Sequence, residues 1–155
     1  MQIARQLIAG ERETKTGFLD LGNLGLTEVP AELFELTHLR ELNLGSWYLD
    51  QDGKYQESCN GNEETSNGFG VLPQFFEALP VLRMLSLVGN PITDLSPLQA
   101  CTGLQQLICS DTQVTDLSPL QACTGLQQLD CSRTQVTDLS PLQACTGLQQ
   151  LICSD

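Results

Sequence analysis

Leucine recurs at regular intervals along most of the chain, in short stretches where apolar and polar residues alternate. Leu-x-Leu or Leu-x-Cys units occupy residues 19–21, 42–44, 85–87, 107–109, 129–131 and 151–153. In a β-strand, such alternation sends the first and third residues of a unit to one face and the middle residue to the other. The pattern therefore predicts short parallel strands near residues 18–21, 41–44, 84–87, 106–109, 128–131 and 150–153.

The second half of the chain is an almost exact repeat with a period of 22 residues. Residues 93–114, 115–136 and 137–155 all begin with TDLSPLQACTGLQQL. In the middle copy, SPLQ at 118–121 predicts a short helix, with Ser as its N-cap and Pro at its first position, and Gly125 is expected to end it. One such coil cannot bury its own apolar edge, so we expect the coils to stack with strands about 4.8 Å apart.

Periods of 20–29 residues around a Leu-x-Leu core are typical of leucine-rich repeats. The 22-residue copies resemble the internalin-type subclass, and residues 19–44 (LDLGNLGLTEVPAELFELTHLRELNL) resemble the longer repeats of bacterial Roco proteins. The resemblance implies an α/β solenoid: a right-handed superhelix with a concave parallel β-sheet and short helical or 3-10 convex segments. The family's usual asparagine between coils is present as Asn90 but replaced by Thr112 and Thr134. Because their hydroxyls can form similar bonds, we expect the stack to survive.

We expect residues 1–155 to form a single domain. Residues 1–17 are predicted to be an N-terminal helical cap, with Ile3, Leu7 and Ile8 on one face and Gly10 as the stop. The near-identical copies at 93–155 have no matching cap. They are expected to continue beyond the chain end; the alternative is end-to-end self-association through the uncapped C-terminal coil.

An insertion interrupts the repeats between the second and third predicted strands. Residues 46–70 are rich in Gly, Asn and acidic residues, which predicts a loop leaving the strand end and able to overhang the concave surface. A loop of this length is either functional or disordered. If it is ordered, Trp47, Tyr48 and Tyr55 are candidate contact residues. The DQDG stretch at 50–53 does not fit the ligand spacing of a calcium loop.

The charge balance is strongly acidic, with 19 acidic and 7 basic residues and a net charge of −12. Such a surface repels phosphate backbones and anionic lipid, so we expect no nucleic acid and no membrane among the partners. The acidity is also explained by solubility alone. The chain shows no apolar run long enough to span a membrane and no secretion signal, which favours a cytoplasmic location.

The cysteines and the single histidine suggest no catalytic or metal chemistry. Six of the seven cysteines fall at repeat positions with C-x7-C spacing, unlike a metal site. We expect them to be reduced, buried apolar residues, although stacked cysteines one coil apart approach disulfide distance. Cys59 in the insertion is the expected exposed thiol, and His38 an ordinary surface residue. With no glycine-rich phosphate loop either, no cofactor is predicted.

The three exact copies differ at only two of the 19 positions that they share. The first lies between the core residues of each strand, hence on the concave face, and holds Ile108, Asp130 and Ile152. The second lies at the rim and holds Asp111, Arg133 and Asp155, with the arginine expected between the two aspartates. This divergence favours a partner-binding face on which both isoleucines are exposed; the alternative is that duplicated copies collect tolerated changes on any surface.

These patterns predict a module that binds a protein or peptide on its concave face and is not an enzyme. An alternative is a ligand-sensing or regulatory arm of a larger multidomain protein, such as a bacterial Roco-type GTPase. A third, the bacterial ubiquitin-ligase type, needs a cysteine-dependent domain that these residues do not encode. The predicted contact residues are Asp20, Asn43, Trp47, Tyr48, Tyr55, Ser86, Ile108, Asp111, Asp130, Arg133 and Ile152.

Overall fold

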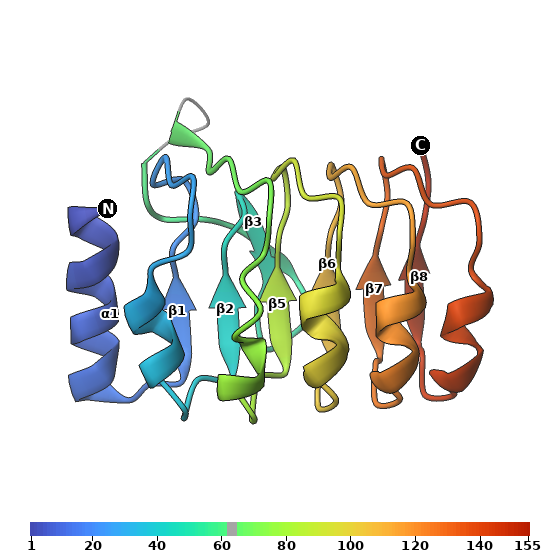
Figure 1. The fold of residues 1–155 in the computed structure, drawn as a ribbon, viewed down its shortest axis with the longest axis horizontal. Helices are drawn as coiled ribbons and strands as arrows, with labels where there is room; N and C mark the ends of the chain where they lie inside the picture. Colours follow the sequence, from blue (N-terminus) through green and yellow to red (C-terminus); the bar gives the residue numbers. More distant parts are fainter. Residues whose placement is uncertain (62–64) are drawn as a thin grey trace.

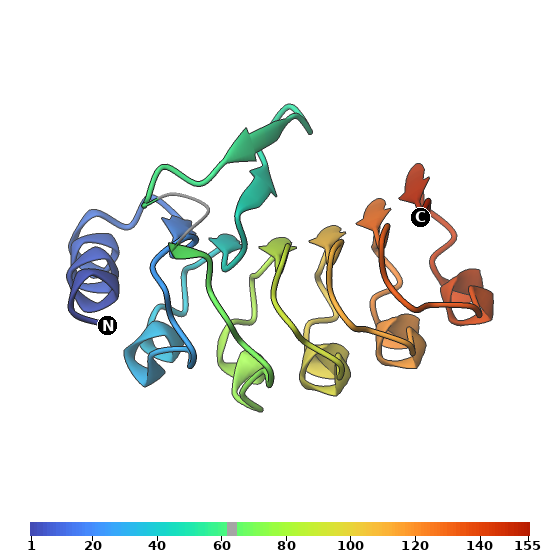
Figure 2. The same cartoon turned by 90° about the horizontal axis from the view of Figure 1, so that it is seen from above.

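The computed structural model describes residues 1–61 and 65–155, which form a curved solenoid (Figures 1 and 2). Each coil contributes one strand to a six-stranded sheet, and neighbouring strands pair in parallel. The predicted parallel strands are confirmed, although each is one residue shorter than expected. In sheet order they are β1 (Phe18–Asp20), β2 (Glu41–Asn43), β5 (Met84–Ser86), β6 (Gln106–Ile108), β7 (Gln128–Asp130) and β8 (Gln150–Ile152).

The spacing of the repeats determines the register of the sheet, because equivalent positions of consecutive coils lie side by side. Leu107 pairs with Leu129, and Leu129 pairs with Leu151. The insertion does not disturb this register, since Leu42 pairs directly with Leu85 across it. All of these leucines except Leu151, which is exposed in the last coil, lie in one continuous core.

Short 3-10 helices form the convex side, opposite the sheet (Figure 2). The N-cap prediction for Ser118 is wrong: its amide and hydroxyl both donate to Asp116, at 2.8 and 2.6 Å, and its side chain caps nothing. These two bonds lower the pKa of Asp116. The helix also ends before Gly125, at Ala122, because Cys123 leaves the helical conformation with φ −87° and ψ 58°. On the convex side, the described residues form η1 (Ala31–Glu35), η3 (Phe76–Ala78), η4 (Ser96–Ala100), η5 (Ser118–Ala122) and η6 (Ser140–Ala144).

The N-terminal helix α1 (Gln2–Thr14) packs against β1 and η1 at one end of the solenoid (Figure 1). It passes through Gly10, the predicted stop, and ends where Lys15 adopts a left-handed conformation. Its buried face is Ala4, Ile8 and Glu11, which are spaced i, i+4 and i+7, whereas Ile3 lies off this face and is exposed, unlike the prediction.

A buried carboxylate fastens α1 to the first coil. Glu11 accepts hydrogen bonds from the amides of Thr16 and Gly17 and lies 2.9 Å from His38 Nε2. Burial alone would raise the pKa of Glu11, yet the bonds from Thr16, Gly17 and His38 together hold that pKa below its ordinary value. His38 is therefore part of the helix attachment and not the ordinary surface residue that was expected.

Two asparagines join backbones between coils. The Asn90 amide donates to the carbonyls of Leu44 and Leu87, and its oxygen accepts from the Phe69 amide. Asn67 does the same one coil earlier, bridging the carbonyls of Leu21 and Leu44 and accepting from the amides of Leu24 and Leu26. In the exact repeats, the hydroxyls of Thr112 and Thr134 donate only to carbonyls of their own coils. The stack survives there through its sheet and core instead.

The repeat cysteines lie where the sequence places them, with one exception. All seven cysteines are free thiols, and Cys101, Cys109, Cys123, Cys131 and Cys145 are buried. Burial raises the pKa of Cys123 and of Cys131 to about 11 each, which keeps both thiols protonated at neutral pH. Cys153 was also expected to be buried, but in the last coil of the chain it is exposed, as is Cys59.

We expect a thiol reagent to modify two cysteines of the native 155-residue chain, Cys59 and Cys153, and all seven under denaturant. Burial protects the other five both by blocking access and by suppressing the reactive thiolate. Intact-protein mass spectrometry after alkylation near pH 8 counts the modified thiols directly. Rapid labelling of five or more cysteines in the native chain would mean that the repeat cysteines are not packed in the core.

Candidate functional site: the concave face and its hairpin

The insertion folds into a β-hairpin that lies across the concave face (Figure 2). Strands β3 (Trp47–Leu49) and β4 (Tyr55–Glu57) pair in antiparallel fashion. Between them the Asp50 carboxylate accepts hydrogen bonds from the amides of Asp52 and Lys54, both at 2.9 Å. Gly53 adopts a positive φ of 73° in the turn. The insertion is thus folded where the structure describes it; residues 62–64 of the predicted loop lie outside the described residues.

A small apolar cluster holds the hairpin on the sheet. Leu49 of the hairpin packs with Val88 and Ile108, and Ile108 has no exposed surface. The expectation that Ile108 is exposed is therefore wrong. Its side chain does face the concave side, but the chain's own hairpin covers it.

This contact predicts different effects of serine substitutions at the two isoleucines. Ile108→Ser should lower the free energy of unfolding by about 2 kcal/mol, because a buried aliphatic side chain is lost. Ile152→Ser should change it by less than about 0.5 kcal/mol, because Ile152 is only half-buried and lies outside the buried cluster. Urea unfolding of both variants measures the difference. Equal, small effects would place the hairpin away from β6.

A tyrosine anchors the hairpin to the next coil. The Tyr55 hydroxyl donates to Asp130 Oδ2 at 2.5 Å, while Asp130 Oδ1 accepts from the amide and hydroxyl of Ser132. Partial burial and then the hydrogen bond and charge of Asp130 raise the pKa of Tyr55 well above its ordinary value. Tyr55 therefore remains a neutral donor to a carboxylate that is itself buried.

The segment after β4 is anchored at the other end of the concave face, on Asp20. The Asp20 carboxylate accepts from the Asn43 side chain at 2.8 Å, from the Ser58 hydroxyl at 3.0 Å and from the Cys59 amide at 3.1 Å. Asn60 adds a bond to the Asp20 carbonyl at 2.8 Å. Asp20 and Asn43 are consequently buried, and their side chains are hydrogen-bonded to other residues of the chain.

The remaining predicted contact residues of the insertion have mixed positions. Ser86 is buried and donates to the Trp47 carbonyl, while the Trp47 side chain is exposed. The Tyr48 ring packs on Phe18 of β1 with 5.1 Å between ring centres. Of the six concave positions named from sequence, five are thus covered, namely Asp20, Asn43, Ser86, Ile108 and Asp130, and only Ile152 stays partly open.

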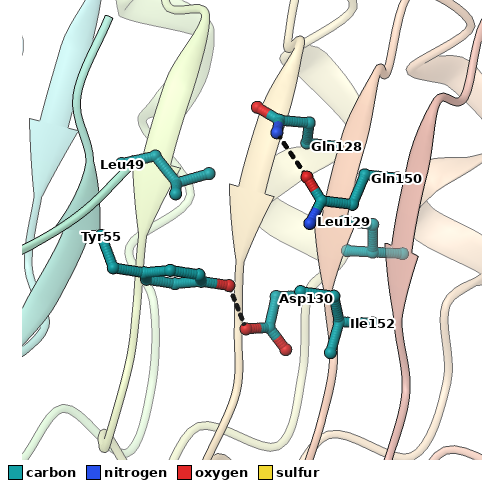
Figure 3. A pocket seen from close by; sticks show the side chains of 7 residues that line it. All are labelled: Leu49, Tyr55, Gln128, Leu129, Asp130, Gln150 and Ile152. Carbon is teal, nitrogen blue, oxygen red and sulfur yellow. Dashed lines mark hydrogen bonds between the residues drawn. The ribbon is translucent and has the colours of Figure 1, made fainter. Parts of the chain in front are cut away.

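Beside the hairpin, a small cleft remains between its residues and the last two strands (Figure 3). Tyr55 and Leu49 form one wall, and Gln128 and Gln150 are bridged by an amide hydrogen bond of 2.8 Å above the sheet. The lining is Leu49, Tyr55, Gln128, Leu129, Asp130, Gln150 and Ile152. The cleft is therefore mainly apolar, with a few polar groups at its edges.

The rim positions keep their exposure. Arg133 lies 3.5 Å from Asp111 and both side chains are exposed, so the pair contributes at most about 1 kcal/mol. The expected second ion pair, to Asp155, is not formed within the described residues. Asp111 and Arg133 have positive φ angles of 54° and 51°, at the position that Gly89 occupies in the preceding coil. Long charged side chains are thus displayed where the backbone favours glycine.

The divergence of the exact repeats has an explanation within the chain. Ile108 matches Leu49, and Asp130 matches the Tyr55 hydroxyl, so neighbouring copies differ where the hairpin contacts them. Sequence reasoning missed Leu49, Val88, Ser58 and Asn60. The signal that was available is the Asp-Gly pair at 52–53 between two apolar or aromatic segments, which is typical of a hairpin turn.

Two further classes of site find no support in the part of the chain that the structure describes. Over residues 1–61 and 65–155, no group of three or more His, Cys, Asp or Glu side chains is placed to hold a metal ion. In the same residues, no helix has the length and apolar character needed to cross a bilayer.

Comparison with known proteins gives matches in sequence families and in structures. Residues 80–122 match the family model of leucine-rich repeats in two copies. The fold is similar to an internalin (inlF) of Listeria monocytogenes, with a TM-score of 0.70 and 26% identity over 94% of this chain and 36% of the internalin. No curated protein matches the sequence.

Two more solved structures show the same architecture. Internalin C2 of Listeria monocytogenes is similar with a TM-score of 0.59 and 29% identity, over 88% of this chain and 61% of that one. A leucine-rich-repeat protein of Leptospira interrogans has a TM-score of 0.74 at 21% identity, over 95% of this chain and 34% of its own, and shows the fold alone. The chain spans less than two thirds of each of these three proteins.

Proposed function

Because the chain is a leucine-rich-repeat protein, we propose that it is an interaction module that binds a protein or peptide partner. The observation that supports a particular surface is the cleft between the hairpin and strands β7 and β8. The cleft itself holds only about 10 Å³, so a partner would lie over it, where the lining offers apolar surface for contact and amide and carboxylate groups for orientation, the combination that suits peptide recognition. The binding surface is thus composite, formed by hairpin and sheet together.

This composite surface differs from the open row of six concave residues that the sequence predicts. Ser86 is buried and holds the hairpin through the Trp47 carbonyl, while Ile152, Tyr55 and Trp47 remain available for a partner. The exposed rim pair of Asp111 and Arg133 borders the same side and supplies charge. A protein partner of neutral or basic character suits the net charge of −12, whereas nucleic acid does not.

The test is selection of a random displayed-peptide library on the whole chain, followed by solution affinities of the enriched peptides. We expect Ile152→Ser to weaken these peptides about tenfold or more, because losing an apolar anchor costs about 1–2 kcal/mol of binding. Gln121→Ala, an exposed change on the convex helix η5, is the matched control and should leave affinity unchanged.

Folding does not confound this comparison, because Ile152→Ser removes little buried surface. Peptides that bind the Ile152→Ser chain as well as the parent chain, or that lose affinity with Gln121→Ala, would reject the cleft as the binding surface. Failure to enrich any peptide would count against peptide recognition altogether.

A further inference from the structure

Two arginines lie side by side where β2 and β5 begin. Arg40 directly precedes β2 and Arg83 directly precedes β5, and the Arg83 amide donates to the Arg40 carbonyl at 2.7 Å. The two residues therefore occupy equivalent positions of adjacent coils. They are two of only seven basic residues in a chain with 19 acidic ones.

These arginines differ from the other three in having no acidic partner. Arg5, Arg12 and Arg133 each form an ion pair, with Glu32, Glu35 and Asp111 respectively. Within the described residues, neither Arg40 nor Arg83 has a carboxylate within ion-pair distance. In so acidic a chain, two arginines of adjacent coils that form no ion pair are an unexpected arrangement, and the one nearby carboxyl on the cavity wall, Glu41, is close enough for the Arg40 charge to act on its pKa.

The Arg40 side chain is held in place by the backbone of Thr16 and Gly17. Its guanidinium donates to the Thr16 carbonyl at 3.3 Å and lies against Gly17, which has a φ of 86°. A Cβ at position 17 would come within 2.8 Å of Arg40 Nε, so a side chain there would displace the guanidinium from this position. Ordering this flexible side chain before any ligand arrives lowers the entropy cost of binding.

The two arginines border a polar cavity of about 250 Å³ at the N-terminal ends of the strands. Gln51, from the turn of the hairpin, forms part of its wall, and Phe18 of β1 contributes an apolar side. Glu41 also lines the cavity: burial raises its pKa, and the neighbouring Arg40 opposes that shift. The lining residues are Thr16, Gly17, Phe18, Arg40, Glu41, Gln51 and Arg83.

We propose that this cavity binds one carboxylate group, held between the Arg40 and Arg83 guanidinium groups with the Gln51 amide beside it. A planar carboxylate of single charge matches the guanidinium fork. A phosphate or a polyanion carries more charge and is repelled by Glu41 and by the net charge of −12. The carboxylate comes from an acidic side chain or from the C-terminus of a protein. This inference rests on the proposed function only in assigning that carboxylate to the protein partner.

Side-chain NMR of the five arginines tests the site without knowledge of the partner. The ¹⁵N-labelled chain is titrated with acetate, then with two blocked tripeptides, one bearing a glutamate side chain and one a free C-terminal carboxylate. Ionic strength is kept constant with chloride, because salt screens these charges. We expect the Nε signals of Arg40 and Arg83 to shift and saturate, while those of Arg5 and Arg12 stay in place. Whichever tripeptide binds more tightly identifies the source of the carboxylate.

Two variants provide the matched comparison. Arg83→Gln should weaken carboxylate binding about tenfold or more, since a charge-assisted bond is lost. Arg12→Gln, which removes an equal charge from helix α1, away from the cavity, should not. Signals of all five arginines moving together without saturation, equal binding by the Arg83→Gln chain, or tighter binding of inorganic phosphate than of acetate would each overturn the proposal. None of these results affects the peptide test at Ile152, so the two proposals fail separately.

Discussion

Replacing Leu107 with alanine should lower the free energy of unfolding by about 2–5 kcal/mol, because a cavity opens in the centre of the stack. Leu107 is fully buried in β6, with strand neighbours on both sides, so the structure has little freedom to collapse around the lost atoms. Urea unfolding followed by circular dichroism measures the change. The effect is large because each coil depends on its neighbours to bury its apolar residues.

The matched control is Gln121→Ala, an exposed residue on the convex side of the neighbouring coil. Its expected effect is within about 0.5 kcal/mol. If Leu107→Ala cost no more than this control, the leucine ladder could not be the core of the fold.

Replacing Asn67 with alanine should cost about 3 kcal/mol or more, a larger effect than most polar substitutions. The side chain donates to the carbonyls of Leu21 and Leu44 and accepts from the amides of Leu24 and Leu26, all within the first two coils. Removing it leaves several buried backbone groups without partners, each costing about 1–3 kcal/mol. Thermal unfolding and urea unfolding both report the loss.

Thr112→Val provides the comparison, because Thr112 stands in its coil where other coils have an asparagine that bonds between coils. The Thr112 hydroxyl donates only to the Cys109 carbonyl of its own coil, at 2.6 Å, so its removal should cost about 1 kcal/mol. Similar costs for the two variants would show that bonding between coils has no special weight in this stack.

The strands could be predicted from sequence because their signal is local and repeated. Alternation around Leu107 and Leu129, copied every 22 residues, leaves one register in which the first leucine of each strand faces the core. The fold family followed from the same period. The helix boundaries could not be placed as well, since a single 3-10 turn at Ser118 requires neither a serine cap nor a glycine stop.

The position of the hairpin could not be predicted, because it depends on contacts between residues far apart in the chain. Tyr55 and Asp130 are 75 residues apart, and nothing near either residue indicates the other. The same is true of Ser58 and Asp20. Asn67 was missed for a related reason: the insertion moves it 23 residues along the chain from Leu44, whose carbonyl it binds.

The variable residues of the exact repeats illustrate how exposure was misjudged. Sequence placed Ile108 and Asp130 correctly on the concave face, yet a residue on that face is exposed only if nothing else covers it. Leu49 covers Ile108 and Tyr55 covers Asp130. The copies therefore differ at this position because each residue contacts a different part of the hairpin. Ile152 is the equivalent of Ile108 and lies one strand beyond Asp130, to which Tyr55 of the hairpin is bonded. The proposed cleft lies there.

The claim that the hairpin is docked on the concave sheet is tested most directly by a double-mutant cycle between Leu49 and Ile108. Free energies of unfolding are measured for Leu49→Ala, Ile108→Ala and the double variant in the whole chain. Side chains in contact should show a coupling energy of about 0.5 kcal/mol or more. Effects that simply add, within about 0.3 kcal/mol, would mean that the two residues do not touch and that the concave face is open.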